Sequence, residues 1–357
     1  MNLHVRPWLD RIEPYLPGKP AASSDGSLAS NESPIGASRS VLAAIGAAVH
    51  RVHRYPDPLA NELRQELAKV NGVTPEQILV GNGSDELIFL LAWAYLARNG
   101  HVVCADPAYR VDEISARVVD ARLTKIPLVD WRHDLGAMAG VDADIAYVVN
   151  PHNPTGTVRS RGEIEEFVAA SAAGLVVVDE AYLDFADDPA ALTAMPLVAQ
   201  GRVAVLRTFS KLHGLAGMRI GYLVAEPGIV ATLRKIRAPF SVGSLAQAAA
   251  IAALRDSGFS VEARRYSIAA RDRLTALFER AGYTVVPSQA NFVLVESPDE
   301  RELVDRLEAA GVSVRPGSTL GIPGTVRVSV PSDAGRRLVS RSLGFDTDTV
   351  SAAVERA

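Results

Sequence analysis

The stretch VAVLRTFSK (residues 203–211) decides the fold, because an apolar, β-branched run leads directly into a polar end that carries Lys211. Two earlier stretches have the same form: IAYVVNPHN (residues 145–153), which ends at Asn153, and LVVVDEAY (residues 175–182), which contains Asp179 and Tyr182. Runs of this kind are typical of strands buried in a parallel sheet. Because the carboxyl ends of parallel strands meet at one edge of a sheet, we expect these four polar residues to lie together there.

The order of the predicted elements indicates an α/β fold. Apolar, strand-like runs alternate with helical patterns through the middle of the chain, which predicts a mostly parallel central sheet flanked by helices. Long helical patterns and two further strands follow, at about 291–295 and 325–330. We therefore expect three parts: residues 1–54 as an N-terminal arm and part of a small domain, 55–240 as a large domain, and 241–357 as the rest of a smaller α+β domain made from both chain ends.

Composition excludes several classes of function. The 357 residues are 48% hydrophobic and 22% charged, with a formal net charge of −4, which is typical of a globular protein. There is no block of lysine and arginine for nucleic acid or an anionic membrane, and no apolar run approaches the roughly 20 residues of a membrane span. Cys104 is the only cysteine, so an intramolecular disulfide and a thiolate metal cluster are excluded. We expect a cytoplasmic protein with a small-molecule partner and no metal site.

A further group of residues has the chemistry of a phosphate site. The turn Gly81-Asn82-Gly83-Ser84-Asp85-Glu86 joins a strand-like run to a helical run, so its backbone N–H groups and the positive end of the helix dipole would face an anion. The hydroxyls of Thr208 and Ser210 and the guanidinium of Arg219 are also phosphate ligands. The alternative is a tight turn in which Ser84 caps the helix, beside a polar loop with a surface arginine.

Lys211 is the residue whose chemistry these groups would serve. A lysine amine forms a Schiff base with the aldehyde of pyridoxal 5′-phosphate and then moves the Cα proton of a substrate. In such a site Asp179 would pair with the pyridine nitrogen, Asn153 and Tyr182 would contact the phenolic oxygen, and Tyr109 would stack on the ring. Taken singly, each of these residues has a structural alternative, as a cap, a salt bridge, a turn residue or a packed ring.

Together these motifs resemble the fold-type I pyridoxal-phosphate aminotransferases, and within them the histidinol-phosphate aminotransferase group. The similarity runs from Asn31-Glu32-Ser33-Pro34 and Arg54-Tyr55-Pro56 through the segments above to Val326-Arg327-Val328. It implies a central sheet of the seven-stranded type, pyridoxal 5′-phosphate as cofactor, and the cofactor roles already given. It also implies that Ser84 and Asp85 line the phosphate, and that Tyr55 reaches the phosphate of a partner subunit's cofactor in a homodimer with shared active sites.

The same resemblance implies a substrate site. Arg327 matches an arginine that holds a carboxylate or other anionic group, and Arg315 matches one associated with substrate phosphate. Tyr15 matches an arm residue that closes over substrate, and Asn31 is a further substrate-site candidate. The implied reaction moves an amino group between a donor of the histidinol-phosphate or aromatic amino acid type and a 2-oxo acid such as 2-oxoglutarate.

Departures from the family pattern leave the substrate and the reaction outcome open. Where the family carries a second aromatic residue after Tyr109, this chain has Arg110, Val111, Asp112 and Glu113, so we expect two acids to alter the wall of the site. His152 is either a harmless loop residue, which we favour, or an extra acid-base group near the cofactor. These changes motivate the alternative of a pyridoxal-phosphate-dependent lyase, decarboxylase or decarboxylating oxidase. The acidic, alanine-rich stretch 342–357 is either a helix or a frayed tail.

Overall fold

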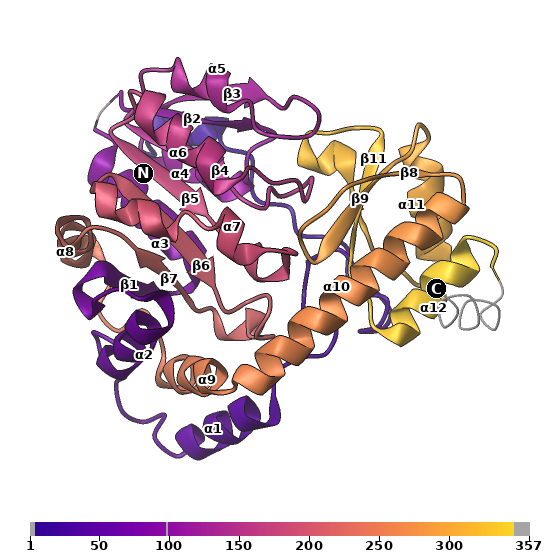
Figure 1. Ribbon diagram of the computed structural model, residues 1–357, viewed down its shortest axis with the longest axis horizontal. Helices are drawn as coiled ribbons and strands as arrows, with labels where there is room; N and C mark the ends of the chain where they lie inside the picture. The colour runs from indigo at the N-terminus through magenta and orange to yellow at the C-terminus, as the bar shows by residue number, and fades with distance from the viewer. Residues whose placement is uncertain (1–3, 98, 346–357) are drawn as a thin grey trace.

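The computed structural model describes residues 4–97 and 99–345, and its central feature is a seven-stranded sheet (Figure 1). The strands lie in the order β1-β7-β6-β5-β4-β2-β3. Their bounds are β1 (Ile78–Gly81), β2 (His101–Asp106), β3 (Arg122–Pro127), β4 (Ile145–Val149), β5 (Leu175–Asp179), β6 (Val203–Thr208) and β7 (Gly221–Val224). Strand β7 runs antiparallel to β1 and β6, and the pairs among β2 to β6 are parallel. The expected mostly parallel sheet of seven strands is confirmed.

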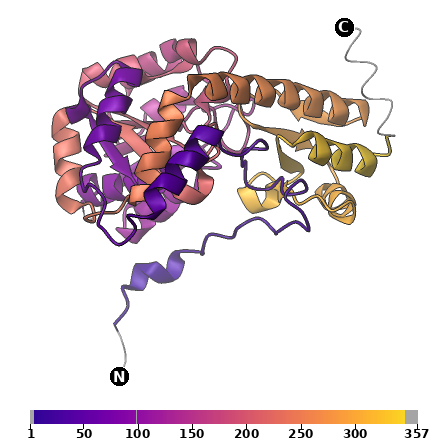
Figure 2. The ribbon, with the colours of Figure 1, turned by 90° about the horizontal axis from the view of Figure 1, so that it is seen from below.

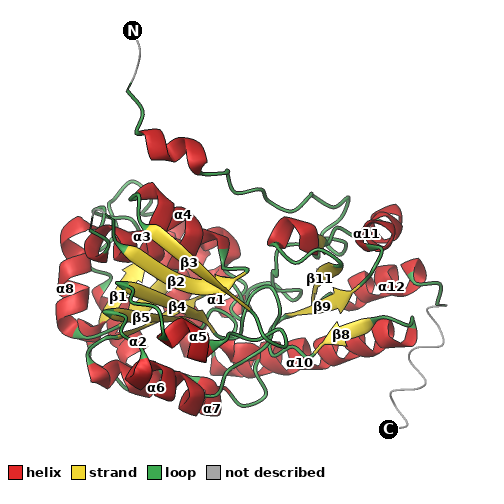
Figure 3. Cartoon of the chain, turned by 90° about the horizontal axis from the view of Figure 1, so that it is seen from above, coloured by secondary structure: helices red, strands yellow, loops and turns green. Residues whose placement is uncertain are grey.

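Helices cover both faces of this sheet and make a three-layer unit (Figure 3). One face packs against α3 (Gly83–Tyr95), α4 (Arg110–Val118) and α8 (Pro227–Ile236). The other packs against α1 (Arg39–Val49), α2 (Asn61–Asn71), α5 (Leu135–Ala139), α6 (Arg161–Ala170) and α9 (Ser244–Arg255). A short helix, α7 (Pro189–Leu192), lies in the connection between β5 and β6.

The two-sided covering explains why the strands are continuously apolar. Along β4, Ala146 and Val148 pack into the α6 side of the core, whereas Ile145 and Tyr147 pack into the α3 side. Successive side chains of a strand point to opposite faces, so a strand covered on both faces must be apolar at every position. The same architecture leaves the carboxyl ends of β4, β5 and β6 as the place where polar residues can gather.

A smaller antiparallel sheet has the strand order β10-β11-β9-β8. Its strands are β8 (Thr284–Val286), β9 (Phe292–Glu296), β10 (Arg315–Pro316) and β11 (Thr325–Ser329), and its helices are α10 (Ser257–Arg280), α11 (Glu300–Ala309) and α12 (Asp333–Ser342). Leu28, from the N-terminal region, packs in the same core as Val293 and Val326, and Ser27 forms a bridge with Ser313. Both ends of the chain therefore contribute to the smaller unit, as expected.

Packing does not follow the expected boundaries at residues 54 and 240. Val41 of α1 and Ala249 of α9 lie in the same core cluster as Val176 of the central sheet. The long helix α10 then runs from the large unit to the smaller sheet, where Leu274 and Phe278 are buried (Figure 1). We propose that the large domain includes α1 and α9 and that the smaller domain begins within α10.

The N-terminal arm, residues 7–18, runs along the outside of the molecule (Figure 2). It begins with the 3-10 turn η1 (Pro7–Arg11), where Trp8 Nε1 donates to the Val118 carbonyl of α4 at 3.1 Å. Among the described residues, no helix is both long enough and apolar enough to cross a membrane. For the C-terminal stretch 342–357, a helix and a frayed tail were the two alternatives. Most of this stretch, from residue 346, lies outside the described residues.

Candidate active site

A cavity of about 210 Å³ opens at the carboxyl ends of β4, β5 and β6. It brings together residues that are up to 189 positions apart in the chain, from Ser30 to Arg219. The predicted residues that line it are Ser84, Asp85, Tyr109, Asn153, Asp179, Tyr182, Thr208, Ser210, Lys211 and Arg219. Ser30 and Glu32 also line this cavity, which we call the cofactor cavity, and neither was among the predicted site residues.

One end of the cofactor cavity is built as an anion seat. Helix α3 begins after Asn82, and no side chain caps its N-terminus, because the Asn82 amide donates instead to the Ser241 carbonyl at 2.8 Å. The alternative in which Ser84 caps this helix is therefore wrong. Gly83 has a φ of 75°, and a Cβ atom there would lie 2.6 Å from Arg219 Nη2. The glycine thus lets the guanidinium approach the free N–H groups of the helix.

Arg219 is held at this seat by neighbours that still leave it available to a ligand. Its Nη2 pairs with Asp85 Oδ2 at 3.1 Å, and its Nη1 is 3.5 Å from Ser210 Oγ. Thr208 Oγ1 donates to Ser210 Oγ at 3.0 Å, which fixes the two hydroxyls side by side. Hydroxyls, a guanidinium and an uncapped helix N-terminus are a set that suits a phosphate dianion.

Lys211 lines the cofactor cavity. Its Nζ donates to the Ser30 carbonyl at 3.2 Å and lies 5.5 Å from the centre of the Tyr182 ring. The Tyr182 hydroxyl accepts from the Asn31 amide at 3.1 Å. The amine is therefore half-buried and free of any carboxylate partner among the described residues, so it is exposed to whatever enters the cavity.

Asp179 forms the buried floor of the cavity. Its Oδ1 accepts the Ala181 N–H at 2.9 Å. Burial raises the pKa of this carboxyl to about 7; the Ala181 hydrogen bond opposes the rise, and the nearby acids Asp85 and Glu180 add to it. A buried acid in this state is stabilised as an anion by any cation placed against it.

These features fit pyridoxal 5′-phosphate. The protonated pyridine nitrogen is a cation that would compensate Asp179, and the anion seat at α3 suits the cofactor's phosphate. Tyr109 borders the same space, and its hydroxyl donates to Asp85 Oδ1 at 2.9 Å. Burial and the neighbouring acids raise the pKa of Tyr109, so its ring stays neutral.

A second cavity, of about 340 Å³, adjoins the first and shares Tyr109 and Asn153 with it. We call it the outer chamber. Arg315, Arg327 and Tyr15 line it, as the sequence led us to expect for substrate residues. Arg327 Nη1 donates to Asn153 Oδ1 at 2.6 Å, and this bond connects the smaller sheet to the loop after β4.

The two arginines of the outer chamber are buried cations, and neither pairs with a carboxylate of residues 4–97 or 99–345. Arg315 donates to the Leu16 carbonyl and lies 5.9 Å from the Tyr15 ring, and Arg327 Nη2 donates to the Ala29 carbonyl at 2.7 Å. The Nε of Arg327 is buried with no hydrogen-bond partner in the described residues. Burial lowers the pKa of Arg327, and the neighbouring Arg315 adds to this effect. Two uncompensated guanidinium groups favour an anionic ligand in this chamber.

Two of the predicted residues do not line either cavity in the described structure. Asn31 is buried behind Tyr182, where its backbone N–H donates to Ser329 Oγ at 2.8 Å, so it orients Tyr182 in this chain. Tyr55 is 83% exposed and stacks on Phe240 with ring centres 4.6 Å apart. Their predicted roles toward substrate and toward a partner's cofactor remain predictions.

The segment after Tyr109 is a helix, and its register corrects the expectation that two acids alter the wall of the site. Helix α4 begins at Arg110, and Asp112 turns into the core, where both of its carboxyl oxygens are buried without a hydrogen-bond partner in the described residues. Burial raises the pKa of Asp112 well above its ordinary value. Arg110 and Glu113 do line the outer chamber, so one acid alters its wall instead of two.

His152 is a buried structural residue, which agrees with the interpretation that we favoured. Its ring nitrogens lie 3.0 Å from Thr155 Oγ1 and 3.1 Å from the Pro107 carbonyl, and its ring packs edge-on against His133. Burial lowers the pKa of His152 to about 4, so the ring is neutral near pH 7.

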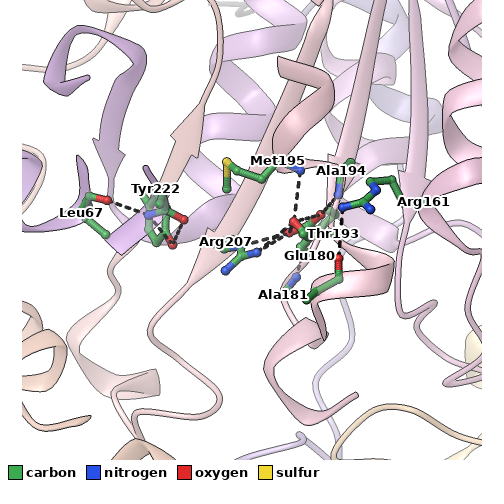
Figure 4. A network of polar contacts seen from close by, with 12 residues as sticks. Leu67, Arg161, Glu180, Ala181, Thr193, Ala194, Met195, Arg207 and Tyr222 are labelled. Atoms are coloured by element: carbon green, nitrogen blue, oxygen red, sulfur yellow. Dashed lines mark hydrogen bonds and ion pairs between the residues drawn. The ribbon is translucent and has the colours of Figure 1, made fainter. Parts of the chain in front are cut away.

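A buried ion pair beside Asp179 supports the floor of the cofactor cavity (Figure 4). Glu180 Oε2 accepts from Arg207 Nη2 at 2.8 Å, and Thr193 Oγ1 donates to the same carboxylate at 3.0 Å. This pair joins the end of β5, where Asp179 lies, to β6, which ends at Thr208 shortly before Lys211. The sequence Asp179-Glu180 does not indicate which of the two acids faces the cavity, because that depends on which face of the sheet each side chain points to.

Comparison with known proteins agrees with this site. The family described as aminotransferase class I and II matches residues 26–341. The histidinol-phosphate aminotransferase of Moorella thermoacetica is 38% identical over 347 residues, which cover 93% of this chain and 90% of that protein. Histidinol-phosphate aminotransferase 2 of Ralstonia nicotianae is 39% identical over 350 residues, covering 92% and 94%.

A solved structure extends the agreement to the fold. The histidinol-phosphate aminotransferase of Sinorhizobium meliloti in complex with pyridoxal 5′-phosphate superposes with a TM-score of 0.88 at 28% identity, over 99% of both chains. These relatives do not favour the alternative of a lyase, decarboxylase or oxidase. The chain belongs to the class I and II aminotransferase family and is a pyridoxal-phosphate-dependent transaminase of fold type I.

Proposed function

We propose that this enzyme transfers the amino group of histidinol phosphate to a 2-oxo acid such as 2-oxoglutarate. The observation that carries the proposal is the pair of buried guanidinium groups, Arg315 and Arg327, that face the outer chamber without a carboxylate partner among the described residues. A phosphate dianion compensates two such charges, whereas an aromatic amino acid brings a single carboxylate. The names of the relatives that are 35–39% identical support the same donor.

The cofactor has assigned neighbours in this proposal. Arg219, Ser210, Thr208 and the N-terminus of α3 bind its phosphate, Asp179 pairs with its ring nitrogen, and Asn153 and Tyr182 contact its phenolic oxygen. When bound, pyridoxal 5′-phosphate supplies an aldehyde that condenses with amines and a ring that accepts an electron pair. Every remaining step of positioning and proton transfer depends on side chains of the chain itself.

Lys211 is the residue that moves protons. Its Nζ lies between the Ser30 carbonyl and the Tyr182 ring and lines the cofactor cavity, which adjoins the outer chamber. A lysine amine that has lost its proton can take one from a bound substrate and return it later. Arg315 and Arg327 orient the substrate, so that its reacting atoms are held in a fixed geometry relative to Lys211.

We further propose a homodimer with shared active sites. Tyr55 borders a surface hollow of about 590 Å³ that Gly217 and Met218 also line, and these two residues belong to the loop between Lys211 and Arg219. The exposed ring of Tyr55 thus lies on the outside of the loop that carries cofactor ligands, where a second copy could receive it.

We also propose that the protein is located in the cytoplasm, as expected from its sequence.

The donor assignment is tested by removing the phosphate from the donor. We expect kcat/KM for histidinol to be lower than for histidinol phosphate by about 10²-fold or more, because two charge-assisted contacts are lost. Arg315→Gln should lower kcat/KM for histidinol phosphate more than for histidinol, and Arg301→Gln, whose side chain is 91% exposed on α11, should change neither. Equal kcat/KM values for the two donors in the unmodified enzyme would exclude phosphate recognition.

A further inference from the structure

The N-terminal arm is attached to helix α4 at one point on the rim of the outer chamber. Arg110 Nη2 donates to the Glu13 carbonyl of the arm at 2.7 Å. Two further bonds between arm and helix lie outward of this point: Trp8 Nε1 to the Val118 carbonyl and Arg117 Nη1 to the Arg11 carbonyl, each at 3.1 Å. Arg110 and Glu13 line the outer chamber. The Arg110 bond is therefore the one of the three that lies at the chamber itself.

A cluster of charges behind Arg110 fixes its guanidinium. Arg110 Nη1 donates to Glu113 Oε2 at 2.6 Å, one helical turn along α4, and Lys125 Nζ lies 3.0 Å from Glu113 Oε1. Lys125 also pairs with Asp106 at 2.8 Å. Burial pulls the pKa of Lys125 down, but its bonds to Asp106 and Glu113 outweigh this and raise it. The cluster thus joins α4, β2 and β3 through four side chains.

The Glu113 side chain is only 8% exposed, whereas that of Arg110 is 31% exposed. A buried carboxylate with two cationic partners cannot give one of them up without a large penalty, so its geometry is fixed. A guanidinium has donors on separate nitrogens in a rigid plane and can bond Glu113 and the arm at the same time. Because Glu113 holds Arg110 in place, Arg110 in turn fixes the position of the Glu13 carbonyl.

The far side of the arm is attached to the substrate arginines. Two residues beyond Glu13, Tyr15 lies against Arg315, which also donates to the Leu16 carbonyl. The arm therefore crosses the outer chamber from α4 to β10, with Arg110 at one end and Arg315 at the other. A chain held at both ends has few conformations to lose when substrate binds beneath it.

We infer that Arg110, fixed by Glu113 and Lys125, is a clasp that positions the arm, and with it Tyr15, over the outer chamber. The inference deepens the proposed function, because it treats this chamber as the donor site. Arg110 and Glu113 are positioning residues and take no part in proton transfer. They occupy the segment where the chain departs from the family's aromatic pattern, and the clasp gives that departure a role.

Limited proteolysis of the holoenzyme without any donor tests the clasp directly. In the arm, Arg6 and Lys19 precede prolines, which trypsin does not cleave, so Arg11–Ile12 is the tryptic bond between them. Loss of residues 1–11 is read by intact mass. We expect Arg110→Ala and Glu113→Gln to speed this cleavage by about 5-fold or more, the factor given by one lost charge-assisted hydrogen bond. Arg110→Lys should be intermediate, and Arg122→Ala, an exposed change on β3, should match the unmodified enzyme.

Steady-state kinetics then separate the clasp from general attachment of the arm. Arg110→Ala should raise the donor KM by about 5- to 10-fold with kcat within about 2-fold, since the reacting groups are untouched. Arg117→Ala removes an arm bond outside the chamber and should leave KM unchanged. In the double variant Arg110→Ala/Glu113→Gln the effect should not exceed that of Arg110→Ala alone, because the two residues act as one unit.

Two results would overturn the inference: cleavage of Arg110→Ala at the rate of the unmodified enzyme, or an equal rise of KM in Arg117→Ala and Arg110→Ala. The proteolysis needs no donor, so it tests the clasp even if histidinol phosphate is not the substrate. In that case KM is measured with whichever donor the enzyme accepts. Failure of the donor assignment and failure of the clasp are thereby distinguishable.

Discussion

At the scale of single residues, the site depends on charged groups that have no partner of opposite charge in the part of the chain that the structure describes. Lys211 has a carbonyl and a ring beside it, Asp179 has one backbone N–H, and Arg327 has a buried Nε without a partner among the described residues. Native proteins pair nearly all buried polar groups. A ligand that places a cation beside Asp179 and an anion beside the arginines would give these groups partners of opposite charge.

Replacement of Lys211 tests its covalent role. Lys211→Ala should bind the cofactor only non-covalently, so borohydride reduction should add no cofactor mass to the protein, and turnover should fall by at least roughly 10²–10⁴-fold. Lys69→Ala, an exposed change on α2, serves as the control. Cofactor mass retained on Lys211→Ala after reduction would assign the covalent link to another lysine.

The raised pKa of Asp179 predicts a pH dependence of stability in the cofactor-free protein. Its folded-state pKa of about 7 lies above the ordinary value of 3.8, so its contribution is present at low pH and is lost as the pH rises through about 7. Asp179→Asn lacks this loss. Relative to that variant, the unmodified apoprotein should lose up to roughly 4 kcal/mol of unfolding free energy between pH 4 and pH 8.

Urea unfolding of both apoproteins across this pH range measures the difference. Added pyridoxal 5′-phosphate should remove most of it, because a ring cation compensates the carboxylate. A difference that stays constant from pH 4 to pH 8 would show that Asp179 is already ionised and compensated in the folded apoprotein.

At the scale of elements, the turn before α3 is the most sensitive part of the anion seat. Gly83→Ala places a Cβ 2.6 Å from Arg219 Nη2 at a φ of 75°, so either the guanidinium or the turn must move. We expect the cofactor dissociation constant to rise by about 10-fold or more, with a stability loss of roughly 1–2 kcal/mol from the left-handed backbone.

Gly201→Ala is the matched control for this prediction. Its φ is 79° and a Cβ there meets no atom within 4 Å, so it carries the same backbone cost without reaching the site. Titration of both apoproteins with cofactor, beside thermal unfolding, separates the two effects. If Gly83→Ala and Gly201→Ala bind the cofactor equally well, the close approach of Arg219 has no role in cofactor binding.

The elements that could be predicted from the sequence are those with an unbroken apolar run. Strands β4, β5 and β6 are covered on both faces and were predicted within a residue or two. Strand β3 (RLTKIP) is a polar edge strand, and β7 (GYLV) is a four-residue strand after a glycine-rich loop, so neither has that signal. Strand β3 could not be predicted because it is exposed, and β7 because it is short. Pairing with neighbouring strands forms both of them despite the weak sequence signal.

The cofactor cavity could be predicted more fully than the outer chamber for a related reason. Its residues follow strand ends, where topology alone brings them together. The outer chamber joins the arm, α4, β3 and β10, and no periodic pattern places Lys125 or Arg110 beside Glu113. The acid that turns inward, Asp112, could not be separated from Glu113 because no helical register was predicted for this segment.

At the scale of the whole molecule, the proposed homodimer shares its active sites through Tyr55. Tyr55→Ala should weaken cofactor binding while the central fold is kept, since its ring is 83% exposed in the single chain. A mixed dimer of one Tyr55→Ala chain and one Lys211→Ala chain should contain one active site that has neither substitution. Random mixing in equal amounts should restore about one quarter of the unmodified activity.

Sedimentation of the mixture shows whether dimers form, and the activity shows whether sites are shared. Activity that stays at the sum of the two separate variants, in a sample that is dimeric and exchanges subunits, would mean that each chain completes its own site. A monomer at working concentration would remove the proposed role of Tyr55 altogether.

The central claim, amino transfer from histidinol phosphate to 2-oxoglutarate at a site built around Lys211, is tested most directly by following the nitrogen. Purified holoenzyme is incubated with histidinol phosphate labelled with ¹⁵N on its amine, with and without 2-oxoglutarate. We predict one equivalent of ¹⁵N-glutamate for each donor consumed, and no catalytic turnover without the acceptor. Continued turnover without acceptor that releases ¹⁵N-ammonium, or no consumption of this donor while another amine is used, would contradict the account.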